Sequence, residues 1–122
     1  MKRLALTCTV LSLMFFVGIA SAYYYNLTVP PFSGSASTNN QAKAITNAYG
    51  WINSYGVGGN YQVDARFEDL NGSGITGWYR IDDGTYISTP INRSAGSLIH
   101  VRFSSDTFTK VHVQVDGDWN PG

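Results

Sequence analysis

Three segments of the chain alternate between apolar and polar residues, and this period of two constrains the fold more than any other feature. In "YQVDARFED", Tyr61, Val63, Ala65 and Phe67 alternate with charged or amide side chains. "LIHVRF" and "TKVHVQVD" repeat the pattern, with apolar positions Ile99, Val101, Phe103, Val111, Val113 and Val115. Because successive side chains of a strand point to opposite sides of a sheet, each segment predicts a strand with one buried and one polar face.

Three further segments are strand candidates with weaker patterns. "YYYNLTV" predicts a first strand that ends before a pair of prolines, since proline cannot donate to the hydrogen-bond ladder. In "GITGWYRID", Ile75, Tyr79 and Ile81 share one face and Trp78 lies on the other. The segment 39–56 could form a helical turn or two, but its asparagines and glycines weaken a helix. A strand or a strand pair is therefore the favoured interpretation there.

Turn signals separate these segments. "GVGGN", "NGSG", "DDG" and "NRSAGS" are rich in residues that accept positive φ or favour turns. Short strands at such intervals are typical of an antiparallel sandwich or a small barrel. We predict an all-β fold, an antiparallel β-sandwich of about six or seven strands in a single domain.

The first 22 residues predict a signal peptide. A basic start, "MKR", precedes an uncharged and mostly apolar run over 4–20, and "ASA" follows as a small-x-small cleavage site. A membrane anchor is the alternative, but the run is short of the roughly 20 apolar residues that a span needs. We expect cleavage after Ala22 and a secreted domain, 23–122, that does not stay inserted in a membrane.

The expected mature domain has little charge and no cysteine. The only cysteine, Cys8, lies in the predicted signal peptide, so disulfides, a thiol nucleophile and cysteine–zinc sites are excluded from 23–122. Of the eight basic residues, Lys2 and Arg3 are also in the signal peptide, which leaves six against eight acidic residues, a net charge of −2. This balance gives no electrostatic attraction for nucleic acid. A cysteine-free exported chain favours a bacterial export route.

No catalytic arrangement is evident. His100 and His112 lie on the polar faces of predicted strands, and no serine sits in a Gly-x-Ser-x-Gly elbow. Asp64 and Glu68 share a strand face with Arg66 between them, which predicts an exposed charged ladder rather than a glycosidase pair. We therefore expect a non-enzymatic protein without a cofactor.

Two pairs of aspartates raise the question of calcium, for which carboxylate oxygens are the usual ligands. Asp82–Asp83 and Asp116/Asp118 each flank or precede a glycine, but neither matches a known calcium loop, and Asp-Gly is a favoured turn dipeptide. We predict structural turns and no metal. In "VHVQVDGDWNPG" we expect Gly117 to break or bulge the strand and Asp118 to accept local backbone N–H groups. Trp119 then either covers one end of the core or lies on the surface.

Aromatic residues are the main candidates for a binding site. The chain has three tryptophans, Trp51, Trp78 and Trp119, and eight tyrosines. Exposed rings could form a platform that stacks on sugar rings, as in carbohydrate-binding modules. Alternatively, the rings fill a core that lacks disulfides. Trp78 is the informative position, because it faces away from the apolar side of its segment.

Four segments, "YGWINSYG", "GITGWYRI", "HVRFSSDTF" and "VDGDWNPG", resemble small secreted proteins of Gram-positive bacteria that have no assigned function, and more loosely the lactococcin-972-type bacteriocins. The resemblance implies a sandwich fold and a non-enzymatic role at the cell envelope, and it transfers no functional residue. We expect a bacteriocin-like or envelope-associated secreted protein whose partner is a cell-wall component or glycan. The alternative is a carbohydrate-binding module that uses exposed aromatics.

Overall fold

The computed structural model describes residues 22–122, so the predicted signal peptide and Cys8 lie outside the described residues, except for Ala22. The described chain forms strands and connecting loops, with no helix in that range. The strands are β1 (Tyr23–Val29), β2 (Ser35–Ser37), β3 (Gln41–Ala42), β4 (Tyr49–Val57), β5 (Val63–Asp69), β6 (Tyr79–Ile81), β7 (Tyr86–Pro90), β8 (Leu98–Ser105) and β9 (Val113–Asn120).

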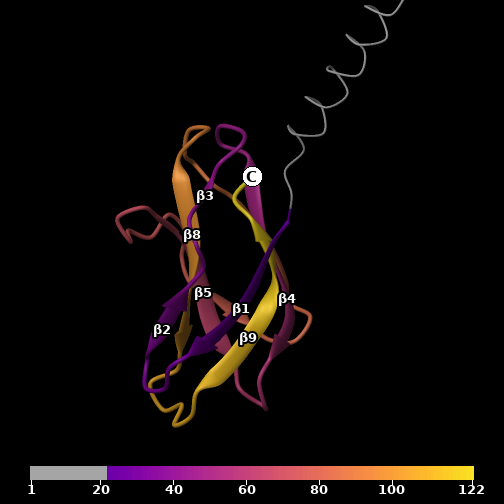
Figure 1. The fold of residues 1–122 in the computed structure, drawn as a ribbon, viewed down its shortest axis with the longest axis vertical. Coiled ribbons are helices and arrows are strands. Elements are labelled where there is room, and N and C mark those ends of the chain that lie inside the picture. Colours follow the sequence, from indigo (N-terminus) through magenta and orange to yellow (C-terminus); the bar gives the residue numbers. More distant parts are fainter. Residues whose placement is uncertain (1–21) are drawn as a thin grey trace, which may run out of the picture.

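These strands form two antiparallel sheets that pack face to face, as Figure 1 shows. Sheet A has the order β1-β9-β4-β7. Sheet B has the order β2-β8-β5-β6, and β3 pairs with β8 beyond the end of β2. The all-β, antiparallel arrangement predicted from the sequence is confirmed. The strand count exceeds the prediction because β2 and β7 lie outside the segments predicted as strands, and β2 has only three residues, too few to show an alternation.

The core lies between the two sheets and contains the apolar positions of the alternating segments. Val63, Ala65 and Phe67 of β5 are fully buried, as are their counterparts on β8 and β9, which are Ile99, Val101, Phe103, Val113 and Val115. Removing each large apolar side chain from water stabilises the fold by about 1.5–3 kcal/mol. Tyr61 and Val111 lie just before β5 and β9 and are exposed, so each of these strands begins two residues later than the alternation indicated.

The segment that was ambiguous between helix and strand contains two strands joined by a turn and no helix. Residues 41–42 form β3 and residues 49–57 form β4, but the two strands belong to different sheets and do not pair with each other. Between them, Lys43 is buried and donates hydrogen bonds from Nζ to the carbonyl oxygens of Ala48 (2.7 Å) and Pro121 (2.9 Å). Burial lowers the pKa of this ammonium group. The contact fastens the β3–β4 loop to the residues that follow β9.

The last strand continues through Gly117, so the prediction that this glycine breaks or bulges β9 is wrong. The irregularity lies on the neighbouring strand, where Ser54 pairs with Gly117 and Gly56 pairs with Asp116, which leaves Tyr55 as the extra residue of a β-bulge. The glycine is needed for a different reason. A Cβ at this position would lie 2.2 Å from the Asn53 carbonyl oxygen and 2.7 Å from the Tyr25 hydroxyl.

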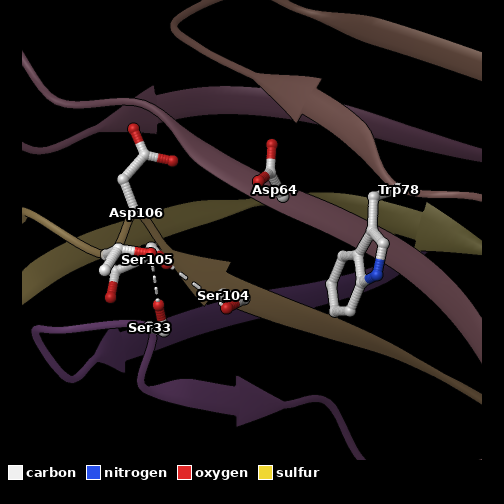
Figure 2. Close-up of a pocket in the computed structure, with 7 residues that line it drawn as sticks. Ser33, Asp64, Trp78, Ser104, Ser105 and Asp106 are labelled. Carbon is white, nitrogen blue, oxygen red and sulfur yellow. Dashed lines mark hydrogen bonds between the residues drawn. The ribbon is translucent and has the colours of Figure 1, made fainter.

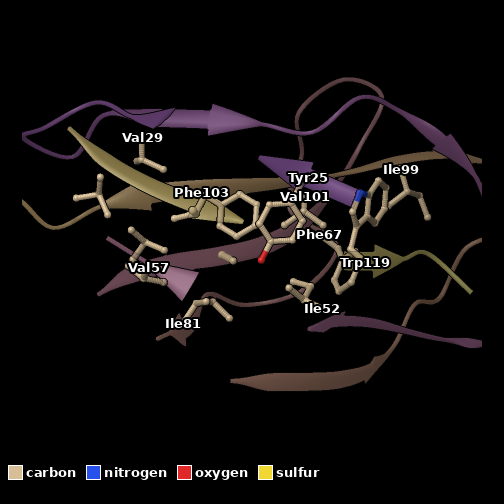
Figure 3. Packing of buried hydrophobic residues seen from close by; sticks show 14 of the residues in the cluster. Tyr25, Val29, Ile52, Val57, Phe67, Ile81, Ile99, Val101, Phe103 and Trp119 are labelled. Carbon is tan, nitrogen blue, oxygen red and sulfur yellow. The ribbon is translucent and has the colours of Figure 1, made fainter. Parts of the chain in front are cut away.

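Tyr25 of β1 fills the space above Gly117 and connects the two sheets. Its side chain is 3% exposed, and its ring centroid lies 4.8 Å from that of Phe103 on sheet B, as Figure 3 shows. The hydroxyls of Tyr25 and Ser54 are both buried without a hydrogen-bond partner among the described residues. Burial raises the pKa of Tyr25 well above its ordinary value. The nearby Ser54 hydroxyl lowers this pKa, but its effect is smaller.

Replacing Gly117 with alanine is expected to destabilise the fold by at least about 1–3 kcal/mol, the usual cost of overpacking, because the new methyl group overlaps a backbone oxygen. Urea unfolding measures the change. Gly77→Ala is the matched control, since a Cβ at Gly77 meets no atom within 4 Å. Equal unfolding free energies for the two variants would contradict the role given to Gly117.

Replacing Tyr25 with phenylalanine removes a buried hydroxyl that makes no hydrogen bond, so stability near neutral pH is expected to stay equal or to rise. At alkaline pH the stability of the variant is expected to exceed that of the wild type by a larger margin. A tyrosine in the unfolded chain loses its proton near pH 10, whereas folded Tyr25 keeps it because its pKa is raised, so rising pH favours unfolding of the wild type. Urea unfolding of both proteins at about pH 8 and pH 11 tests this, and a gap that does not widen would refute it.

Candidate functional site

The three tryptophans lie in three different places. Trp119 is 1% exposed and packs in the core against Phe67, with ring centroids 6.3 Å apart, as Figure 3 shows. Two placements were considered for Trp119, over the core or on the surface, and the first is correct. The ring is therefore not available on the surface. Trp51 lies on the outer face of sheet A, while Trp78 precedes β6 of sheet B and is 44% exposed. They therefore belong to two separate surfaces.

Sheet A presents five aromatic side chains on its outer face, which we name the aromatic face. Its rings are Tyr24 of β1, Tyr49, Trp51 and Tyr55 of β4, and Tyr86 of β7. The four tyrosines are each more than half exposed, and Trp51 is half-buried. Trp51 and Tyr86 are diagonal neighbours on paired strands and stack with ring centroids 6.3 Å apart and an interplanar angle of 29°. So many exposed rings on one sheet face indicate a binding surface.

Polar side chains lie between these rings. The pairing of β1, β9, β4 and β7 places Tyr24, Asp118, Asn53 and Tyr86 in one row across the sheet. The Tyr55 hydroxyl donates a hydrogen bond to Asp118 Oδ2, and this bond raises the pKa of Tyr55. The structure thus corrects the prediction for Asp118, which accepts from a side chain of the neighbouring strand rather than from local backbone.

Sequence reasoning identified Trp51 but missed the four tyrosines of the aromatic face. The signal was present in "YGWINSY", where Tyr49, Trp51 and Tyr55 occupy alternate positions opposite the buried residues Gly50, Ile52 and Ser54. This alternation was not used as evidence for an aromatic face, because the segment was ambiguous between helix and strand. Tyr24 and Tyr86 come from distant parts of the chain, and strand order alone brings them to the same face.

Trp78 borders a pocket of about 340 Å³ at one end of sheet B, which we name the Trp78 pocket (Figure 2). Its lining comes from the β1–β2 turn, β5, the segment before β6, and the end of β8 with the loop that follows. The residues are Ser33, Asp64, Trp78, Ser104, Ser105, Asp106 and Thr107. Hydroxyls, carboxylates and one large ring thus surround the same space.

Two arginines organise the charges around this pocket. Arg80 donates from Nη1 to both carboxylate oxygens of Asp106 at 2.9 Å, and its Nε lies 3.2 Å from Asp64 Oδ1. Partial burial raises the pKa of Asp64, against the opposing effect of Arg80. On the other side, the Arg66 guanidinium lies over the Trp78 ring, 4.5 Å from its centroid, in a cation–π contact.

Glu68 corrects the prediction of an exposed charged ladder on β5. Its side chain is 1% exposed and lies 2.7 Å from Arg66 Nε, 2.8 Å from His100 Nε2 and 3.9 Å from Arg102 Nη1. The loop after β5 turns back so that Gly74 forms a β-bridge with Glu68. His100 is also less open than a solvent-facing histidine, since its Nδ1 lies 2.9 Å from Asn40 Oδ1. Glu68 therefore holds neighbouring strands together.

The acidic turns bind backbone groups, as the structural interpretation predicts for Asp82 and Asp83. Asp83 Oδ1 accepts from the Val57 N–H at 2.7 Å, and Asp82 Oδ1 accepts from the Asp83 N–H at 2.8 Å. Within residues 22–122, no group of three or more histidine, cysteine or acidic side chains is placed to hold a metal ion. The same range contains no helix that is long and apolar enough to cross a membrane.

Comparison with known proteins assigns no relative. No protein-family model matches the chain, and no curated protein matches it. The resemblance to lactococcin-972-type bacteriocins, which rests on short segments, stays a prediction.

Replacing Glu68 with alanine is expected to lower the free energy of unfolding by about 3 kcal/mol, the lower end of the cost of breaking a buried ion pair, because Arg66 and His100 lose their shared partner. Arg102→Ala is the control. Arg102 is 42% exposed and lies 3.9 Å from Glu68, so its loss is expected to cost less than about 1 kcal/mol. Urea unfolding of both variants measures the difference, and similar losses would show that Glu68 is not the centre of the network.

Proposed function

We propose that the protein is a secreted, non-enzymatic carbohydrate-binding module whose aromatic face contacts a glycan, with a cell-wall polysaccharide as its partner. The observation that supports this function is the set of five aromatic rings on the outer face of sheet A, including the stacked pair Trp51 and Tyr86. Flat rings match the apolar faces of sugar rings, and tyrosine adds a hydroxyl that can hydrogen-bond to the ligand.

The polar groups of the aromatic face fit the hydroxyls of a sugar. Asp118 and Asn53 lie side by side in the same row as Tyr24 and Tyr86, so that a hydrogen-bond acceptor and an amide stand between two rings. The acidic residues of this face are Asp116 and Asp118, with no basic residue on the four strands of sheet A. Such a face repels acidic polysaccharides and favours neutral or basic glycans.

The shape of this surface fits an extended chain. The rings lie on an open sheet face, and the row from β1 to β7 crosses three inter-strand spacings of about 4.8 Å each. A short oligosaccharide laid across the strands would contact Tyr24 at one end and Tyr86 at the other. A wall glycan is also the partner that an envelope-associated protein needs, so glycan binding is compatible with the bacteriocin-like role, which stays a prediction.

Alanine at Trp51 or Tyr86 is expected to weaken glycan binding about tenfold, which corresponds to the roughly 1.4 kcal/mol at the upper end of one aromatic stacking contact. Pull-down with insoluble cellulose, chitin, xylan and peptidoglycan, at a series of protein concentrations, measures the affinity of each variant.

Phe108→Ala is the matched control, because Phe108 is 88% exposed and lies in the β8–β9 loop, outside the aromatic face. Its binding is expected to equal that of the wild type. Urea unfolding confirms that Trp51→Ala is folded, since this ring is half-buried. Failure of the wild type to bind any of the four polysaccharides, or an equal loss in Phe108→Ala, would count against the proposed function.

A further inference from the structure

We infer that the Trp78 pocket is a second glycan site, which binds one neutral sugar ring by stacking on Trp78 and hydrogen bonding to Asp64 and Asp106. This inference rests on the proposed function in taking the ligand to be a sugar, but it concerns the opposite sheet. Trp51 and Trp78 lie on the outer sides of sheets A and B respectively, so each site can be occupied without the other.

The dimensions of the pocket fit a small ligand. Its volume of about 340 Å³ is at the low end of the range of about 300–1,000 Å³ for small-molecule sites. Unlike the aromatic face, its lining combines strand residues with the loop residues Ser33, Asp106 and Thr107. A single ring, such as a chain end or a branch, is the unit that fits there.

The rim of the pocket is held in a backbone conformation that local sequence does not favour. Phe32 and Ser33 have φ of 57° and 61°, in the left-handed region that residues other than glycine seldom adopt. The turn is fixed by hydrogen bonds from Phe32 N–H to the Thr109 carbonyl (2.9 Å) and from Ser33 N–H to the Asp106 carbonyl (3.2 Å). It brings the Ser33 and Thr107 hydroxyls within 3.1 Å of each other at the pocket edge. Residues in such strained conformations concentrate at functional sites.

The polar groups of the pocket are already oriented for a polyhydroxylated ligand. Asp64 and Asp106 are held by Arg80 at 3.2 and 2.9 Å, which fixes two carboxylates in the pocket wall. Each carboxylate has further lone pairs that can accept from sugar hydroxyls. The Ser104 hydroxyl lines the same wall, and Trp78 supplies the apolar surface for the ring.

Charge decides which class of small molecule binds. The carboxylates of Asp64 and Asp106 are paired with Arg80, and the guanidinium of Arg66 on the Trp78 ring is paired with Glu68. A cationic ligand would meet a ring that already holds a guanidinium, and an anionic ligand would meet both carboxylates. A neutral ligand with many hydroxyls meets neither penalty. The pocket therefore favours neutral sugars over amino sugars and uronic acids.

The tryptophans make the test specific, because each of the three indole N–H groups reports on one location. Trp51 reports on the aromatic face, Trp78 on the pocket and Trp119 on the core. Their signals in a ¹H–¹⁵N spectrum of the purified protein are assigned with Trp51→Phe and Trp78→Phe. The probes are glucose, galactose, mannose and N-acetylglucosamine as neutral sugars, glucosamine as a cation and glucuronate as an anion, each titrated to saturation.

At least one neutral sugar is expected to shift the Trp78 signal in a saturable manner, while Trp119 stays in place. Asp106→Ala is expected to weaken this binding at least about tenfold, as loss of a hydrogen bond to a charged group does. Asp116→Ala is the matched control on the aromatic face and should leave the Trp78 titration unchanged.

The inference is overturned if no neutral sugar moves Trp78, or if glucosamine or glucuronate binds there more tightly than every neutral sugar. Movement of Trp51 alone overturns it too, while leaving the proposed function in place. A shift of the Trp78 signal alone supports the second site. The polysaccharide pull-down then tests independently whether the aromatic face binds a glycan.

Discussion

The apolar contact between the inner faces of the two sheets is the interaction on which the rest of the structure depends. No described residue is a cysteine, so no disulfide holds these sheets together. Apolar burial and aromatic contacts across the interface hold them together. Tyr25 on sheet A contacts Phe103 on sheet B, and Trp119 on sheet A contacts Phe67 on sheet B. Gly117 leaves room for the Tyr25 ring, because a Cβ at that position would lie 2.7 Å from the Tyr25 hydroxyl.

This dependence on the interior explains which parts of the structure were predictable from the sequence. Which residues of a strand face the core follows from the alternation of side chains along that strand, and this alternation can be seen in the local sequence. The buried positions of β5 and β8 accordingly follow the pattern, from Val63 to Phe67 and from Ile99 to Phe103. Where that local signal is interrupted, prediction fails. Tyr55 is an extra residue in the β4 bulge, so the phase of β4 changes and Val57 points inward although Tyr55 points outward.

The composition of the outer faces could not be predicted in the same way, because it depends on which strands become neighbours. Tyr24 and Asp118 are adjacent only through the pairing of the first and last strands of the described chain. The local sequence predicts that Glu68 is an exposed charge. In the structure, His100 and the loop that turns back at Gly74 bury this side chain. Trp78 was identified because a ring on the polar side of a strand conflicts with the local pattern, and such conflicts are expected at functional or strained sites.

The two outer faces are built from different chemistry although they cover the same core. Sheet A exposes tyrosines, amides and two carboxylates, and sheet B exposes arginines that are matched with acidic residues. On sheet B the charges are engaged with one another, and at one end Trp78 borders the same pocket as the carboxylates of Asp64 and Asp106. On sheet A the four tyrosines of the aromatic face are each more than half exposed. Because the inner faces hold the two sheets together, an exposed outer side chain such as Tyr86 can be exchanged without loosening the contact between the sheets.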